Sequence, residues 1–296
     1  MIEIADPAEM RAWSRRERAA GRRIGFVPTM GYLHEGHLRL VDRARARSDR
    51  TVLSAFVNPL QFGPGEDFER YPRDPERDRA HARNRGVDCY FAPAVNALYP
   101  VPPVIRLTAG SLIAHLCGPR RPGHFEGVLL VVAKLFHLVE PDLAIFGRKD
   151  VQQAVLIRRM VDDLNFPIDI DVAPIVREAD GVALSSRNVY LSPPERRAAV
   201  ALSRGLERAH AAFTTGTSDA AVLAELVRET IGRESLVALE YVEAVDPHTL
   251  QPVLSTTADT LLAVAGRVGR ARLIDNIILG QGLGADERLS HATAAT

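Results

Sequence analysis

The sequence is short of several residue types, and each shortage excludes a class of protein. Its 296 residues include only two cysteines, Cys89 and Cys117, which are too few for a disulfide framework or for a structural zinc site built from cysteines. Such sparing use of cysteine is typical of a reduced, cytosolic setting. The longest strongly apolar run, residues 128–133, is far too short to span a bilayer. The first residues contain no apolar h-region, so no signal peptide is expected.

The sequence also lacks an excess of charge of either sign. Lys plus Arg and Asp plus Glu each number 37, so the formal net charge is zero. A whole-molecule electrostatic attraction to nucleic acid is therefore not expected, although a local basic patch would not show in this balance. Three enzyme signatures are missing as well: the P-loop G-x-x-x-x-G-K-[ST], the hydrolase G-x-S-x-G and the metalloprotease H-E-x-x-H, for which position 38 carries Leu.

What the sequence does contain is a regular alternation of apolar strands and helices over about its first 175 residues. The expected strands are 24–29, 51–57, 87–92, 143–147 and 168–173, and the expected helices are 35–47, 75–85, 125–139 and 149–164. The strands have near-continuous apolar cores, as strands covered on both faces do. The alternation predicts an α/β fold with a Rossmann-like, doubly wound parallel sheet. Such sheets bind ligands at the carboxyl ends of their strands.

After Pro174 the pattern changes to helices followed by strands, which indicates a smaller α+β domain. Ser192, two prolines and Glu195 predict a capping box at the start of a long helix. The further elements expected are a helix over 218–232, strands over 238–245, 260–265 and 271–279, and a disordered tail over 289–296. We therefore expect two domains, residues 1–175 and 176–296.

A pair of histidines stands at the expected start of the helix over 35–47. In "VPTMGYLHEGHLRL", residues 27–40, Gly31 follows the strand, and the i, i+3 spacing places His34 and His37 on one face of the helix. Unpaired N–H groups and the positive end of the helix dipole meet there, so phosphate is a natural ligand. Two surface histidines in a turn are the plain alternative, and a metal site would need a third ligand that the sequence does not reveal.

Two further stretches place amides and apolar residues near strand ends and helix starts. In "FVNPLQFGPGEDFERYPR", residues 56–73, Asn58 and Gln61 follow a strand directly, where functional loops often lie. In "RPGHFEGVLLVVAKLF", residues 121–136, His124 precedes an apolar helix. Val131 and Val132 on that helix either line a pocket or fill the core, and core packing is the default.

Two more stretches carry positive charge and hydroxyl groups. In "FGRKDVQQ", residues 146–153, Lys149 opens a helix and shares a face with Gln153 through the i, i+4 spacing. A lysine there can stabilise phosphate charge in a transition state, although a lone lysine is usually just solvated. In "ADGVALSSRNVYL", residues 179–191, the hydroxyls of Ser185 and Ser186 precede Arg187, whose guanidinium suits phosphate oxygens. The plain alternative is a flexible linker.

In this order and spacing, the five stretches resemble the pantoate–β-alanine ligase family within the H-x-G-H nucleotidyltransferase superfamily. The resemblance covers residues 24–192 and extends weakly to "RLIDNI" near the end. It implies a ligase that forms a carbon–nitrogen bond. ATP and (R)-pantoate would give pantoyl adenylate and pyrophosphate, and β-alanine would then give pantothenate and AMP, with Mg²⁺ accompanying ATP. It also implies a cytoplasmic homodimer, with residues near Tyr71 at the contact, and no nucleic-acid or membrane partner.

The resemblance also assigns roles by position. His34 and His37 would hold the ATP phosphates in the transition state, Lys149 would stabilise the same charge, and Ser185, Ser186 and Arg187 would form a mobile phosphate-binding loop. ATP would further contact Met30, Gly147 and Asp150. Gln61 and Gln153 would hold the hydroxyls and carboxylate of pantoate, in a pocket walled by Met30, Asn58, His124, Val131, Val132 and Phe146. Residues 1–175 would bind nucleotide and pantoate, and residues 176–296 would act as a lid.

Two positions depart from the family pattern. Arg148 stands where glutamate is usual and adds a positive charge next to Lys149, whereas Leu184 replaces a methionine of similar volume.

Three alternatives stay open. One is another H-x-G-H nucleotidyltransferase that acts on a phosphate ester, but the amides and apolar residues of "NPLQFG" and "RPGHFEGV" favour a small carboxylic acid. A tRNA-charging enzyme is disfavoured by the zero net charge. A non-catalytic nucleotide-binding protein that has kept the fold finds its only support in Arg148, because His34, His37 and Lys149 are all present.

Overall fold

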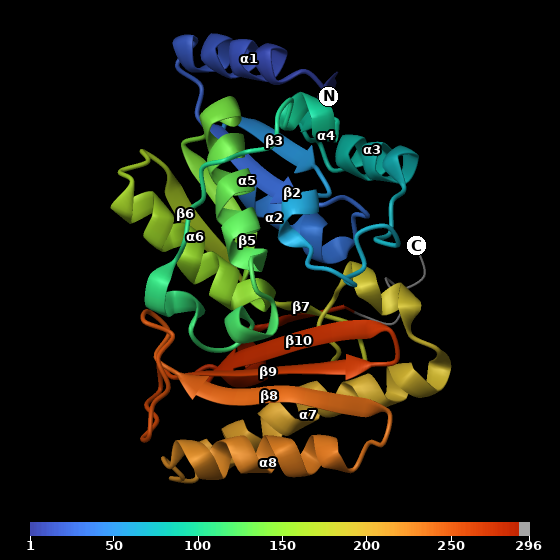
Figure 1. The fold of residues 1–296 in the computed structure, drawn as a ribbon, viewed down its shortest axis with the longest axis vertical. Helices are drawn as coiled ribbons and strands as arrows, with labels where there is room; N and C mark the ends of the chain where they lie inside the picture. Colours follow the sequence, from blue (N-terminus) through green and yellow to red (C-terminus); the bar gives the residue numbers. More distant parts are fainter. Residues whose placement is uncertain (290–296) are drawn as a thin grey trace. The chain divides into compact units, whose positions relative to one another are not determined.

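A six-stranded parallel sheet organises the first of two units in the computed structural model, which describes residues 1–289 (Figure 1). Its strands are β1 (Ile2–Ile4), β2 (Ile24–Thr29), β3 (Arg50–Ala55), β4 (Cys89–Phe91), β5 (Leu143–Gly147) and β6 (Asp169–Ala173). The spatial order is β1-β4-β3-β2-β5-β6. From β2 the chain moves through β3 to β4, and β5 then returns to the other side of β2. The order therefore reverses between β2 and β5, which is where sheets of this kind bind ligands.

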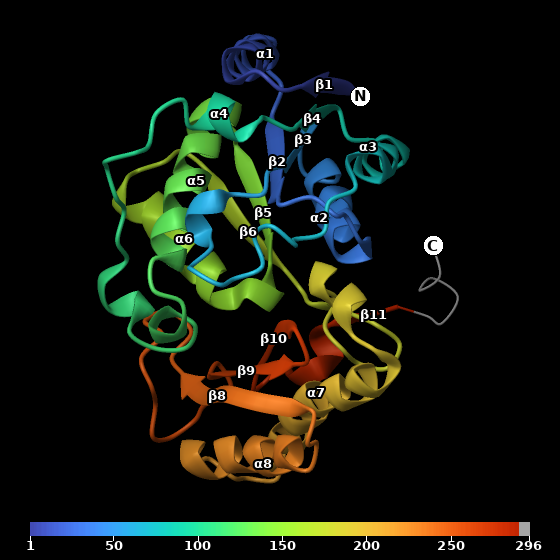
Figure 2. The ribbon, with the colours of Figure 1, turned by 45° about the vertical axis from the view of Figure 1, so that its right-hand side comes forward.

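Helices cover both faces of this sheet, and neighbouring residues of β2 show how. The helices of this part of the chain are α1 (Pro7–Ala19), α2 (Glu35–Arg45), α3 (Pro75–Asn84), α4 (Val95–Leu98), α5 (His124–Val139) and α6 (Val151–Asp163). Phe26 packs its ring edge-on against Phe136 of α5, with centroids 6.4 Å apart. Val27 lies in a buried cluster with Val41 of α2. Because successive side chains of a strand point to opposite faces, α5 and α2 lie on opposite sides of the sheet (Figure 2).

The predicted doubly wound parallel sheet is confirmed, with local differences at some elements. The expected helix over 149–164 begins as a 3₁₀ turn, η4 (Arg148–Asp150), and the α-helix starts only at Val151. The sequence analysis missed β1, α1 and α4. For α1 the signals were present, because Asp6 caps the helix through the N–H of Glu9 at 2.8 Å and Pro7 opens it.

The second unit contains an antiparallel sheet covered by two helices, as expected of an α+β part (Figure 1). Its main elements are α7 (Pro193–Thr214), α8 (Ala220–Gly232), β8 (Val237–Val245), β9 (Leu261–Val268) and β10 (Ala271–Ile278). The sheet order is β10-β9-β8, and a separate parallel pair joins β7 (Val176–Arg177) to β11 (Glu287–Arg288). The predicted capping box at the start of α7 is confirmed by the N–H of Ser192, which donates to Glu195 Oε2 at 2.8 Å.

The two units are not continuous in sequence. The first comprises residues 1–109, 121–148 and 153–173, and the second comprises 110–120, 149–152 and the chain from Pro174 onward. Gln152 ties the short segments together: its Oε1 accepts the N–H of Cys117 at 2.9 Å, and its Nε2 donates to the carbonyls of Leu112 and His115. The two domains expected on either side of residue 175 stay a prediction.

Two expectations concern the rest of the chain. From residue 290 onward, the tail expected to be disordered lies outside the described residues. Within residues 1–289, none of the helices combines the length and the apolar character needed to cross a membrane.

Candidate functional site

The histidine pair lies directly after β2, at the switch point of the sheet. His34 is the N-cap of α2 and His37 lies in its first turn. The N–H of His34 donates to His37 Nδ1 at 3.4 Å, and the two rings stack with centroids 4.0 Å apart. Because Nδ1 of His37 accepts a hydrogen bond, the neutral ring carries its proton on Nε2. That Nε2–H is a donor suited to a phosphate oxygen at a helix start.

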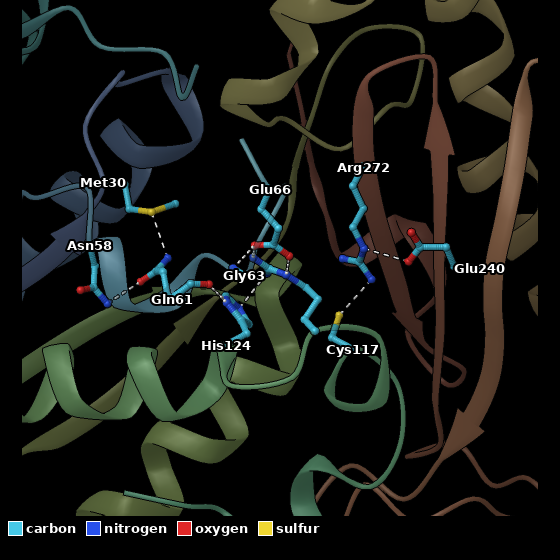
Figure 3. A network of polar contacts seen from close by, with 10 residues as sticks. Met30, Asn58, Gln61, Gly63, Glu66, Cys117, His124, Glu240 and Arg272 are labelled. Carbon is cyan, nitrogen blue, oxygen red and sulfur yellow. Dashed lines mark hydrogen bonds and ion pairs between the residues drawn. The ribbon is translucent and has the colours of Figure 1, made fainter. Parts of the chain in front are cut away.

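Three of the predicted pantoate-site residues form one hydrogen-bonded group (Figure 3). Asn58 caps the short 3₁₀ helix η1 (Pro59–Gln61) and is 1% exposed, and Gln61 is 7% exposed. Asn58 Nδ2 donates to Gln61 Oε1 at 3.2 Å, and Gln61 Nε2 lies 3.0 Å from Met30 Sδ. A thioether is a weak acceptor, so the Gln61 amide is oriented by Asn58 and can exchange Met30 for a stronger partner.

The helix α5 supports this group from its first turns. Asn58 Nδ2 also donates to the carbonyl of Gly127 at 3.0 Å, and Tyr99 OH donates to Asn58 Oδ1 at 3.0 Å. Burial raises the pKa of Tyr99, so its hydroxyl keeps the proton it donates. A Cβ at Gly127 would lie 2.3 Å from the carbonyl oxygen of Leu60, so α5 and η1 meet backbone to backbone. Gly127 lies within a motif stretch, whereas no sequence signal marks Tyr99.

His124 begins α5 and holds the backbone of Gln61 (Figure 3). Its Nδ1 lies 2.8 Å from the carbonyl oxygen of Gln61, and its Nε2 lies 2.8 Å from Arg121 Nη1. A carbonyl only accepts and a guanidinium only donates, so this network places the ring proton on Nδ1. The predicted direct contact of His124 with pantoate stays a prediction.

Arg121 is fixed in turn by Glu66, through two bonds of 2.7 Å from Nε and Nη2 (Figure 3). Burial alone would raise the pKa of Glu66, but the Arg121 guanidinium, together with the N–H of Gly63 and the nearby His124, outweighs burial and holds the pKa below its ordinary value of 4.5. Both residues lie in quoted motif stretches, yet nothing in the sequence predicts that they pair across 55 positions.

The remaining predicted residues of the first unit lie on α5, β5 and α6. Val131, Val132 and Phe146 are buried, as a pocket wall or a core would require. Gly147 ends β5, and apart from its own chain neighbours no atom of residues 1–289 lies within 4 Å of a Cβ built there. This open space beside the strand end is compatible with a ligand. Gln153 lies in the first turn of α6.

Lys149 and Asp150 lie in the second unit, in the 3₁₀ turn η4. Lys149 Nζ lies 3.5 Å from Asp150 Oδ2, and the carbonyl of Lys149 accepts from Asn276 Nδ2 at 3.1 Å. Asn276 belongs to "RLIDNI", so the weak C-terminal resemblance marked a residue that holds the lysine's backbone. The α-helical register begins only at Val151, so the expected shared face of Lys149 and Gln153 does not follow from an α-helix.

The stretch with Ser185, Ser186 and Arg187 forms a hydrogen-bonded 3₁₀ turn. Ser185 Oγ accepts the N–H of Arg187 at 3.3 Å and caps the 3₁₀ helix η5 (Ser186–Tyr190). Asn188 Nδ2 donates to Glu178 Oε1 at 2.7 Å, and Arg196 of α7 binds the same oxygen at 2.6 Å. The hydroxyl-bearing turn is therefore tied to α7 by charged hydrogen bonds.

A buried arginine supports the segment that leads into this turn. Arg177 of β7 is 1% exposed and donates to Asp275 at 2.7 and 2.8 Å, to Asp286 at 2.6 Å and to the carbonyl of Gly181 at 3.1 Å. Burial raises the pKa of Asp275, although the guanidinium opposes the shift. The sequence analysis missed this network, because its two carboxylates lie 98 and 109 positions from Arg177 and carry no local signal.

Comparisons with known proteins agree with the resemblance found in the sequence. Residues 3–278 match the family described as Pantoate-beta-alanine ligase. The pantothenate synthetase of Heliobacterium modesticaldum is 55% identical over 92% of this chain and 96% of its own length, and that of Geobacillus kaustophilus is 51% identical over 94% and 93%.

Two solved structures are similar as well. The crystal structure of pantothenate synthetase from Thermus thermophilus is 48% identical and superimposes with a TM-score of 0.90 over 94% of this chain and 99% of that one. The pantoate–β-alanine ligase of Francisella tularensis, complexed with beta-gamma ATP and β-alanine, is 30% identical, with a TM-score of 0.77 over 95% of this chain and 99% of that one. With this match over most of its length, the chain belongs to the pantoate–β-alanine ligase family.

Proposed function

We propose how individual residues carry out the family's reaction, the ATP-dependent condensation of pantoate with β-alanine to pantothenate. The carboxylate of (R)-pantoate attacks the α-phosphate of ATP, and pyrophosphate leaves. The amine of β-alanine then attacks the acyl carbon of pantoyl adenylate, and AMP leaves. The Francisella tularensis relative is complexed with an ATP compound and β-alanine, which supports both as substrates here.

The observation that carries the proposal is the stacked histidine pair at the start of α2. His34 and His37 bind the ATP phosphates as charge moves onto the departing pyrophosphate, with the Nε2–H of His37 as a fixed donor. Transfer at phosphorus needs positioning and positive charge more than an acid–base group. Lys149, Ser185, Ser186 and Arg187 supply further donors to the phosphates, and Met30, Gly147 and Asp150 border the nucleotide.

Pantoate binds where the amides are held in place. On binding, the Gln61 amide exchanges the Met30 sulfur for a pantoate oxygen, while Asn58 keeps the amide oriented. Gln153 binds the other end of pantoate. His124, Val131, Val132 and Phe146 complete a wall that excludes water from the adenylate, which hydrolyses readily.

Mg²⁺ enters as part of the ATP substrate. It binds phosphate oxygens and water readily and needs only one or two carboxylates from a protein. Within residues 1–289 no group of three His, Cys, Asp or Glu side chains is arranged to hold a metal ion. We further propose a cytoplasmic homodimer with residues near Tyr71 at the contact, testable by sedimentation equilibrium.

The test compares the wild-type protein with His37→Ala. With ATP, Mg²⁺ and (R)-pantoate, the wild type should release pyrophosphate, and AMP and pantothenate should form only when β-alanine is added. His37→Ala should lower turnover by roughly 100- to 1,000-fold, the usual cost of removing one transition-state donor. Its melting temperature should change little, because the side chain is only half-buried.

The matched control is His137→Ala, which removes an exposed histidine from α5. It should leave turnover unchanged. If His37→Ala lost activity only in proportion to its loss of folded protein, the proposed role would be wrong. If the wild type released neither pyrophosphate nor AMP with any combination of substrates, the non-catalytic alternative would be favoured.

A further inference from the structure

We propose that Asp78 is a positioning residue for the histidine pair: its carboxylate fixes the loop between β2 and α2 and so sets the start of α2. The proposal rests on the phosphate-binding role proposed above for His34 and His37. Asp78 belongs to α3 and to none of the five motif stretches.

The carboxylate of Asp78 binds two consecutive backbone N–H groups of this loop. Asp78 Oδ1 accepts from Leu33 at 2.6 Å, and Oδ2 accepts from Tyr32 at 2.8 Å. Gly31 and Tyr32 both have positive φ, 79° and 50°, and this geometry turns consecutive N–H groups towards one point, as in anion-binding nests. Here the anion comes from the protein itself.

Because these two hydrogen bonds are buried, losing them would destabilise the folded protein. Asp78 is 3% exposed and Leu33 is fully buried, so a missing carboxylate would leave a buried donor without an acceptor. Burial raises the pKa of Asp78, and nearby Asp74 adds to the rise, while the two backbone N–H groups and Arg77 oppose it. A carboxylate is retained in such a place only when its hydrogen bonds are satisfied.

The same loop is held at its other end by Thr29. Thr29 Oγ1 donates to the carbonyl of Ser54 on β3 at 2.7 Å and accepts the N–H of Gly31 at 3.1 Å. Leu33, held by Asp78, is followed directly by His34, whose N–H binds His37 Nδ1. The loop is thus hydrogen-bonded to β3 through Thr29 and to α3 through Asp78. The histidine pair begins directly after the residues that Asp78 binds.

The first test is Asp78→Asn, which keeps the shape but replaces one acceptor by an N–H₂ group facing a backbone N–H. Turnover should fall roughly 10- to 100-fold, as expected of a small misplacement of binding groups. The KM for pantoate should stay within about twofold, because α5 holds Asn58 and the backbone of Gln61. The contact of Gln61 with the loop is to Sδ of Met30, which precedes the two N–H groups that Asp78 binds.

The matched control is Asp74→Ala on the same helix. Asp74 caps α3 by accepting the N–H of Arg77 at 3.1 Å and has no bond to the 31–33 loop. It should lower the melting temperature by roughly 2 to 4 °C and leave the turnover of folded protein within about twofold. Equal losses of turnover in the two variants at equal loss of stability would overturn the proposal.

A double-mutant cycle tests whether Asp78 acts through the histidines. If it does, Asp78→Asn combined with His37→Ala should be no slower than His37→Ala alone, within about threefold. Losses that multiply would overturn the inference. Normal turnover of His37→Ala would overturn the proposed role of the pair and the inference with it, whereas a slow His37→Ala with a normal Asp78→Asn would overturn the inference alone.

A second variant disturbs the contact between Asp78 and the loop by a change in the loop itself. In Gly31→Ala the new Cβ would lie 2.9 Å from Asp78 Oδ2, at a φ of 79° that disfavours alanine. It should lower turnover with little effect on the KM for pantoate, even if Asp78→Asn does not fold. Unchanged turnover in Gly31→Ala would contradict the proposal.

Discussion

Glu66 shows how a single side chain can act on the site without touching a substrate. Its carboxylate holds Arg121, Arg121 binds His124, and His124 binds the carbonyl of Gln61 (Figure 3). Each bond in this series is between 2.7 and 2.8 Å. The orientation of the Gln61 backbone therefore depends, through His124, on the ion pair of Glu66 with Arg121.

This ion pair predicts a pH dependence of stability. The pKa of Glu66 in the folded protein lies below 4.5. The contribution of Glu66 to the free energy of unfolding is therefore complete above pH 4.5 and is lost as the pH falls through the pKa of the folded protein. The wild type should melt higher than Glu66→Gln at neutral pH, and the difference should shrink below pH 4.5. Melting curves of both proteins from about pH 7 to about pH 3.5 measure it.

The exposed Glu69 supplies the control, since its side chain lies at the surface of the same loop. Glu69→Gln should follow the wild-type curve throughout. A difference between wild type and Glu66→Gln that stays constant down to the lowest pH would contradict the assignment.

For single residues, the sequence predicted candidates for the site but not the partners that hold them in place. Asn58 and Gln61 were named because they follow a strand, and Met30 was named through the family resemblance. The structure brings the three together. The roles of Tyr99 and Arg121 depend on pairing across 41 and 55 positions. No local pattern encodes such pairs.

Among the elements, the approach of α5 to η1 decides the geometry of the amide group. A glycine inside a helix usually destabilises it. At Gly127 it permits a contact that any Cβ would block, 2.3 Å from the Leu60 carbonyl oxygen. The carbonyl of Gly127 then accepts from Asn58.

Gly127→Ala should therefore separate the two elements and misplace Asn58 and Gln61. We expect the KM for pantoate to rise by roughly tenfold or more, since hydrogen-bonding groups of the pocket lose alignment, while the KM for ATP changes little. Steady-state kinetics with each substrate varied in turn measures this. Gly232→Ala at the end of α8 is the control, because apart from its chain neighbours and its own helix backbone no atom of residues 1–289 lies within 4 Å of the new Cβ. Equal changes in both KM values would argue for a general loss of structure.

Most elements with strong local signals were predicted, whereas α1 was missed although its capping signals were present. The bounds of β2 and β5 agree with the expected ranges because their apolar runs end at turn residues or polar residues. β1 has three residues, of which one is buried, which is too short to give a pattern. The 3₁₀ turn η4 was read as helix because backbone hydrogen bonding, not composition, separates the two.

For the whole molecule, the two units have separate cores, and the buried Arg177 belongs to the second. Arg177→Met would leave the carboxylates of Asp275 and Asp286 buried without their cation. Breaking such a group costs about 3 to 5 kcal/mol. Hydrogen exchange should accelerate in β7 and β10, while β2 and β5 keep their protection.

Arg208→Met, on the exposed face of α7 beside Glu229, is the control and should change exchange very little. Equal acceleration in both units would contradict separate cores, and no acceleration at all would contradict the importance of the buried group.

The architecture was predictable because the spacing of apolar residues along the sequence distinguishes strands from helices. The assignment of segments to the two units was not predictable from this spacing. Residues 110–120 and 149–152 belong to the second unit although they lie within the sequence of the first. Their attachment depends on bonds such as that of Gln152 with the N–H of Cys117, which only the folded chain reveals.

The positions of the two cysteines have a consequence for chemical reactivity. Cys89 lies in β4, and burial raises its pKa to about 12, so almost no thiolate forms at neutral pH. Cys117 lies in the second unit, 3.2 Å from Tyr241 OH and 3.5 Å from Arg272 (Figure 3), and both sulfurs are shielded from solvent. A thiol reagent can reach each sulfur only while its surroundings are transiently open. The rates at which a thiol reagent labels Cys89 and Cys117 would therefore report how often the first and the second unit open locally. No artificial label would have to be introduced.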